Sequence, residues 1–157
     1  MKTLADAFEH TLQDIYYAEK TMTKTMPKLQ EAANGKKLKD AIGEHLEETK
    51  SQVKVLEQVF KSLGKKPEGE KCDAIEGLIK ETDGIISEAS GAAKNAALLA
   101  ACQAVEHYEI ARYGTLREWA KVLGHDEAHD LLTGILDQEK AANSKLTNLA
   151  VSTINAQ

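Results

Sequence analysis

The sequence predicts an all-α protein in which four long helices form a bundle and a shorter helix lies between two helical hairpins. Helix-favouring Ala, Leu, Lys and Glu dominate its 157 residues, while aromatic residues, which strands favour, make up only 4%. Apolar residues recur at alternating steps of three and four along four long segments, the period of an amphipathic helix. Only two prolines occur, so long uninterrupted helices are allowed.

The first two long helices form an N-terminal hairpin. Thr3 can cap a helix over about residues 3–33. Asn34-Gly35 ends this helix, because both residues tolerate the left-handed conformation. A second helix is expected over residues 37–63, where Gly64 follows.

A crossover connection and a second hairpin complete the expected fold. Residues 72–90 have the pattern of a short amphipathic helix, with a break expected near Asp83-Gly84. Further long helices are expected over residues 94–123 and 126–150, the last one capped by Asp126. A link of about 30 residues between two hairpins is typical of ferritin-type bundles. We therefore expect one domain over residues 1–157, a ferritin-like four-helix bundle with an additional short helix in the crossover connection.

Charge and composition exclude several classes of function. The net charge of −5 argues against nucleic acid as a partner, because phosphate binding calls for a basic surface. No run of about eighteen apolar residues occurs, so no membrane span is expected. Asp6 and Glu9 lie where a signal peptide would need an apolar core. Cys72 and Cys102 lack the spacing of a metal motif, and a cytoplasmic location is expected.

Each long helix carries acidic residues on its apolar stripe, near its own middle. A single glutamate on such a stripe is more often a surface residue or a hydrogen-bonded exception. Acids at matching depths in all four helices favour a shared site instead. The inward positions are Glu19 in the first long helix, Glu48 in the second, Glu106 and Glu109 in the third, and Glu139 in the fourth.

A metal ion is the simplest compensation for these carboxylates. Unpaired charges in a core are costly, and the stripes hold no Lys or Arg beside the acids. Numerous oxygen ligands suit magnesium, manganese or iron, and one carboxylate from each of four helices is the arrangement of di-iron bundles. Glu48 follows Glu19 by 29 residues and Glu139 follows Glu109 by 30, which suggests a pseudo-twofold site. His45, one turn before Glu48, is a candidate ligand, a donor to a ligand or a core histidine.

Four segments, in this order, resemble the YciF-like bacterial stress-protein family of the ferritin-like, rubrerythrin-related superfamily. They are FEHTLQDIYYAEK, HLEET, QAVEHYEIARYGTL and LDQEK. The resemblance implies a cytoplasmic bacterial homodimer with a di-iron helical bundle. The positions that match the acidic ligands of such bundles are Glu19, Glu48, Glu106, Glu109 and Glu139.

The sequence departs from the wider superfamily at two positions. Ferritins and rubrerythrins usually place a histidine three residues after the ligand glutamates of the second and fourth helices. Here those positions hold Ser51 and Ala142, which predicts an oxygen-rich site and makes manganese a competitor for iron.

Two functions remain open at this point. The leading one is oxidation of Fe(II) by O2 or peroxide at a dinuclear iron centre during stress. The alternative is a non-enzymatic structural or interaction bundle in which a metal holds the core together. A homodimer is also expected, because the helix at 72–90 adds apolar surface beyond what four helices need.

Overall fold

The computed structural model describes residues 1–155, and within this range the chain forms helices and no strand. The long helices are α1 (Leu4–Ala32), α2 (Lys36–Ser62), α4 (Gly91–Val122) and α5 (Asp126–Leu149). A shorter helix, α3 (Asp73–Glu88), lies in the crossover, and a π-helical turn, η1 (Ala150–Ile154), continues α5. The predicted ferritin-like four-helix bundle with an additional helix in the crossover is confirmed.

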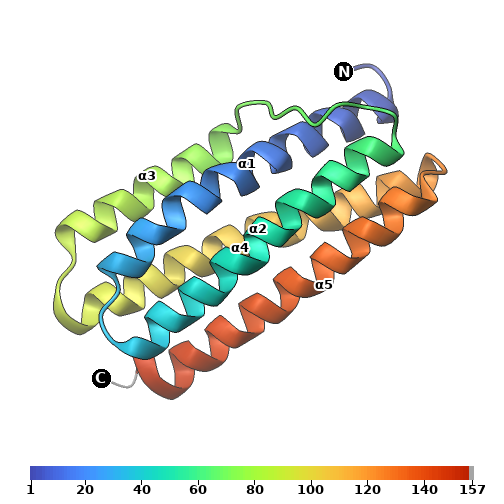
Figure 1. The fold of residues 1–157 in the computed structure, drawn as a ribbon. Helices are drawn as coiled ribbons and strands as arrows, with labels where there is room; N and C mark the ends of the chain where they lie inside the picture. The colour runs from blue at the N-terminus through green and yellow to red at the C-terminus, as the bar shows by residue number, and fades with distance from the viewer. Residues whose placement is uncertain (156–157) are drawn as a thin grey trace.

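The four long helices form two antiparallel hairpins that pack side by side (Figure 1). Helix α1 contacts α2 and α4, and α5 contacts α2 and α4, so the four helices enclose one central core. None of the helices described in residues 1–155 combines the length and apolarity needed to cross a bilayer.

The ends of α1 are fixed by local interactions. The Thr3 hydroxyl accepts a hydrogen bond from the backbone N–H of Asp6, and the Asp6 carboxylate accepts one from the N–H of Thr3. This reciprocal capping box satisfies donors that the first helical turn leaves unpaired. At the other end, Gly35 adopts a φ of 85°, which turns the chain into α2. The buried Asn95 side chain closes this turn by hydrogen bonding both N–H and C=O of Asn34.

Helix α3 packs along α1 and α4 (Figure 1). Residues 65–72 first run in extended form beside α1, where Gly69 approaches the Tyr17 backbone so closely that a Cβ would lie 3.3 Å from Tyr17 Cα. Ile75 is fully buried, and a Lys28–Asp83 ion pair of 2.7 Å joins α1 to α3. The expected break near Asp83-Gly84 is wrong: α3 continues through both residues, because Thr82 is buried and Ile85 packs against the core.

The packing of α3 reduces the apolar surface that is free to contact a second copy of the chain. Its leucine and isoleucine side chains are buried or partly buried against the rest of the chain. The apolar surface that motivated the homodimer is therefore largely used within one chain.

We expect Ile75→Ala to lower the free energy of unfolding by about 2–5 kcal/mol, because it opens a cavity beneath α3. Urea unfolding followed by circular dichroism measures this loss. Ile86→Ala in the same helix is the control and should cost less, since Ile86 is only partly buried. Equal losses in the two variants would show that α3 is not anchored through Ile75.

Candidate metal centre

Four glutamates meet in the middle of the bundle. Glu19 comes from α1, Glu106 and Glu109 come from α4, and Glu139 comes from α5. Each of these side chains is at most 1% exposed. The prediction that these four acids point into the core is confirmed.

Three of these glutamates and one histidine lie close enough together that they could hold a metal ion. His45, Glu106, Glu109 and Glu139 each offer one ligand atom, and these atoms all lie within 4.8 Å of one another. Glu19 lies beside this group: burial raises the pKa of Glu109 and Glu139, and the nearby charge of Glu19 raises it further. The donor set is one imidazole and several carboxylates, which suits iron or manganese.

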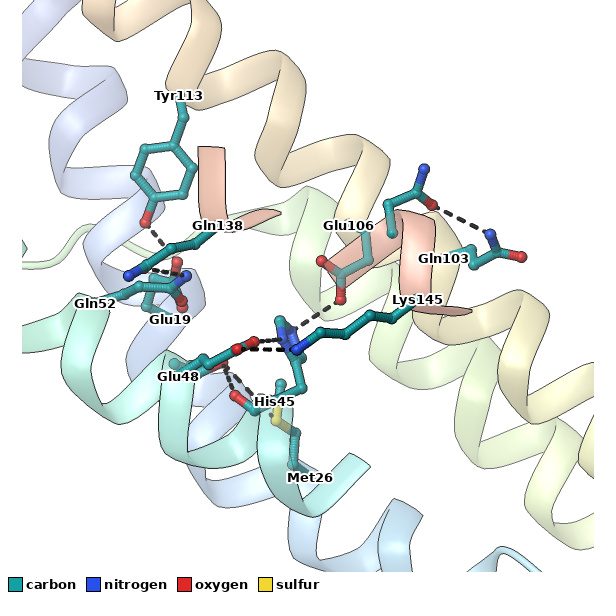
Figure 2. A network of polar contacts seen from close by, with 12 residues as sticks. Glu19, Met26, His45, Glu48, Gln52, Gln103, Glu106, Tyr113, Gln138 and Lys145 are labelled. Carbon is teal, nitrogen blue, oxygen red and sulfur yellow. Dashed lines mark hydrogen bonds and ion pairs between the residues drawn. The ribbon is translucent and has the colours of Figure 1, made fainter. Parts of the chain in front are cut away.

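His45 is the residue whose role the sequence left open. Its imidazole is 13% exposed, with Nε2 lying 2.9 Å from Glu106 Oε1 and Nδ1 lying 3.6 Å from Glu48 Oε2 (Figure 2). Burial lowers the pKa of His45, but the adjacent Glu106 and Glu48 carboxylates outweigh burial and raise it to about 10. His45 therefore belongs to the cluster and is not an isolated core histidine.

Glu48 lies at the edge of the cluster, not within it. Its side chain is 35% exposed, contacts His45 and lies 3.6 Å from Lys145 Nζ (Figure 2). The contact with His45 holds the pKa of Glu48 below its ordinary value. The expectation that Glu48 is an inward carboxylate equal to the others therefore needs correction.

Glu48 lies at the edge of the cluster because of the rotation of α2 about its own axis. Its buried face runs through Ile42, Leu46, Thr49 and Gln52, so that position 48 lies at the border of this face. The residue thirty positions after Glu19, the spacing that joins Glu109 to Glu139, is the buried Thr49. By this spacing, α2 has a buried threonine where α5 has a buried acid.

Two further polar residues complete the site. The Tyr113 hydroxyl donates a hydrogen bond of 2.5 Å to Glu19 Oε1, and both side chains are fully buried. The buried Gln52 amide donates to Gln138 Oε1 at 3.3 Å (Figure 2). Neither Tyr113 nor Gln52 is among the residues that the sequence assigns to the site.

The buried carboxylates have more acceptor oxygens than the neighbouring groups pair by hydrogen bonds. Several of their oxygens have no hydrogen-bond partner among the described residues, namely one each of Glu19, Glu106 and Glu109 and both of Glu139. Burial is the main cause that raises the pKa of Glu19, Glu109 and Glu139, and mutual repulsion adds to it. Unpaired carboxylate oxygens at this depth fit a divalent metal, which would satisfy them and neutralise their charge.

Comparisons with known proteins agree with the fold. The family model of a domain of unknown function, DUF892, matches residues 3–157. The chain belongs to this family. It is 46% identical to protein YciF of Escherichia coli strain K12 over 99% of this chain and 95% of that protein.

Solved structures of relatives have the same fold. The crystal structure of the Escherichia coli stress protein YciF superposes with a TM-score of 0.94 at 45% identity and covers all of both chains. YcfI from Rhodopseudomonas palustris, described as a candidate structural protein, superposes with a TM-score of 0.91 at 52% identity. That match covers 93% of this chain and 94% of YcfI.

The hydrogen bond between Tyr113 and Glu19 provides a test of the cluster's energetics. We expect Tyr113→Phe to lower the free energy of unfolding by about 1–3 kcal/mol, because it leaves a buried carboxylate with one partner fewer. Tyr16→Phe is the matched control, since Tyr16 donates to Glu57, an exposed residue that water can solvate. Equal urea midpoints for the two variants would contradict a special role for Tyr113.

Proposed function

We propose that this protein is a stress-related ferritin-like di-iron carboxylate protein that oxidises Fe(II) with O2 or peroxide. The observation that carries the proposal is the group of buried carboxylates with unpaired oxygens in the centre of the bundle. Its relationship to the stress protein YciF supports the stress-related part.

Distinct roles follow for the residues of the cluster. Glu106, Glu109, Glu139 and His45 would hold one ion, and Glu19 together with shared carboxylates would hold a second. A pair of ferrous ions, when bound, would supply two electrons for reduction of the oxidant. Tyr113 fixes the orientation of Glu19 through its hydrogen bond, and the raised pKa of Glu139 lets this carboxyl release a proton when a cation binds.

Anaerobic titration of the protein with Fe(II), followed by addition of O2 or hydrogen peroxide, tests the proposal. We expect saturation at about two ions per chain and the rise of a ferric absorbance in the near ultraviolet, faster than in buffer. Saturation without oxidation faster than in buffer would contradict the redox function while leaving a metal site intact.

A second function is a structural bundle whose metal only stabilises the core. The favouring observation is that Ala142 occupies a position where redox-active relatives usually carry a histidine. Manganese then competes with iron for the site. This candidate predicts that Mn(II) raises the melting temperature as much as Fe(II) does, with no redox reaction.

We further propose that the protein forms a homodimer, because Ile79, Ile85 and Ile86 of α3 are only partly buried within one chain and leave some apolar surface for a partner. Light scattering at micromolar concentration measures its mass directly, and a monomer mass would contradict this part of the proposal.

A further inference from the structure

A cavity of about 370 Å³ lies next to the candidate metal centre, within the half of the bundle that contains the α1–α2 turn. Exposed residues such as Lys37, Asp40 and Glu44 line its mouth, and the buried Glu106 and the largely buried His45 line its inner end. The cavity therefore leads from the surface to the edge of the carboxylate cluster.

We propose that this cavity binds an uncharged, elongated organic molecule that has an alkyl body and a single terminal hydroxyl group. Its volume lies near the small end of the range for ligand sites. This inference goes beyond oxidation of iron, because it assigns an organic ligand to the protein.

The apolar walls of the cavity favour a ligand with an alkyl body. Met22 and Met26 from α1, Ile42 from α2, and Leu146 from α5 line the cavity with buried apolar side chains. Methionine side chains adapt to ligands of different shape because they are unbranched and polarizable. Each methylene removed from water on binding is expected to increase affinity by up to about fourfold.

The polar residues at the inner end of the cavity favour a ligand with a hydroxyl group. Glu106 is 1% exposed and its Oε2 has no hydrogen-bond partner, so it can accept a hydrogen bond from a ligand. Neither His45 ring nitrogen makes a hydrogen bond, because Nε2 is poorly aligned with Glu106 Oε1 and Nδ1 lies 3.6 Å from Glu48 Oε2, so a ring N–H can donate to a ligand. A hydroxyl group both donates and accepts, and it therefore matches this pair of residues.

Charged head groups fit less well. A carboxylate only accepts hydrogen bonds and would face Glu106 and the other buried acids, and an ammonium group only donates and would leave the His45 ring N–H without an acceptor. At the mouth, Lys37 and Lys145 lie among the acidic Asp40, Glu44 and Glu48, so an anionic head group gains no net attraction there.

Isothermal titration calorimetry on the full-length, metal-free protein with 1-hexanol, 1-heptanol and 1-octanol tests this inference. We expect one site per chain and an affinity that rises by up to about fourfold with each methylene. Octanoate and octylamine should bind at least about tenfold more weakly than 1-octanol. No detectable 1-octanol binding, or an affinity independent of chain length, would overturn the inference.

Variants locate the binding site. Ala41 lines the cavity and is only half-buried, so Ala41→Phe should fill the space without disturbing the core and should abolish 1-octanol binding. Ala41→Leu, a smaller change, should weaken it. Ala141→Phe is the control, because Ala141 is exposed on α5 and lies outside the cavity. Unchanged 1-octanol binding by a folded Ala41→Phe protein would overturn the assignment.

The calorimetry is independent of the iron chemistry. Because no metal is present, 1-octanol binding that Ala41→Phe abolishes supports the cavity whether or not Fe(II) is oxidised. Conversely, oxidation of Fe(II) by a protein that does not bind 1-octanol would overturn the cavity inference alone.

Discussion

Replacing Glu139 with Gln is expected to weaken Mn(II) or Fe(II) binding by about tenfold or more, while leaving the metal-free protein at least as stable as the wild type at pH 8. Glu139 is fully buried, both of its oxygens lack hydrogen-bond partners among the described residues, and burial raises its pKa to about 10. The amide removes a group that is costly to ionise and, at the same time, a strong ligand. Opposite effects on metal affinity and on metal-free stability are therefore expected.

Calorimetric titration with Mn(II) and urea unfolding in EDTA measure the two effects separately. Glu81→Gln makes the same chemical change on an exposed face of α3 and should alter neither quantity. Glu48→Gln should weaken metal binding less than Glu139→Gln does, because Glu48 is 35% exposed and outside the group of four. A Glu139→Gln protein with wild-type metal affinity would contradict the assignment of the cluster as a metal site.

The long helices could be predicted closely because their signals are local. Residues 3–33 and 37–63 were expected to be helical, and α1 and α2 span Leu4–Ala32 and Lys36–Ser62. Helix α4 begins at Gly91, three residues before the predicted start, since a glycine with a φ of 59° can open a helix as well as interrupt one. His125, not Asp126, precedes the first turn of α5, and its side chain makes no capping hydrogen bond.

The site could be predicted only in part. Glu19, Glu106, Glu109 and Glu139 lie on stripes whose phase many apolar neighbours define, so their inward direction followed from periodicity. Around Glu48 the stripe of α2 is polar, and periodicity alone could not distinguish position 48 from position 49. The burial of Thr49 shows which of the two faces the core.

Contacts between helices depend on their relative rotation and offset, which no local pattern contains. The hydrogen bond from Tyr113 to Glu19 joins residues 94 positions apart, and the apolar cavity is formed by side chains of four helices. Neither the hydrogen bond nor the cavity could be predicted from the sequence. The role of His45 falls between these cases, because its spacing to Glu48 was visible but its contact with Glu106 was not.

Stability of the metal-free protein is expected to fall as the pH rises from about 5 to 9. Burial raises the pKa of Glu19 from its ordinary value of 4.5 to about 7 and that of Glu139 to about 10. Across this range the folded state retains protons that the unfolded state has lost, so unfolding releases protons and a higher pH favours it. His45 acts in the same direction, since its folded pKa of about 10 exceeds the ordinary 6.5. The lowered pKa of Glu48 acts only at more acidic pH.

Metal binding should reverse this trend, because a divalent ion replaces the same protons. At pH 8, free Mn(II) at a hundredfold excess over its dissociation constant should stabilise the fold by about 2.7 kcal/mol, which corresponds to about 5–11 °C in melting temperature for a chain of this size. At pH 5 the gain should shrink, because protonation already neutralises Glu19, Glu109 and Glu139. Calorimetric melting in EDTA and in Mn(II) across this pH range measures how the melting temperature depends on pH without and with metal. The Glu139→Gln substitution should make both dependences weaker. A melting temperature at pH 8 that EDTA and Mn(II) leave equal would show that the buried carboxylates do not serve a metal.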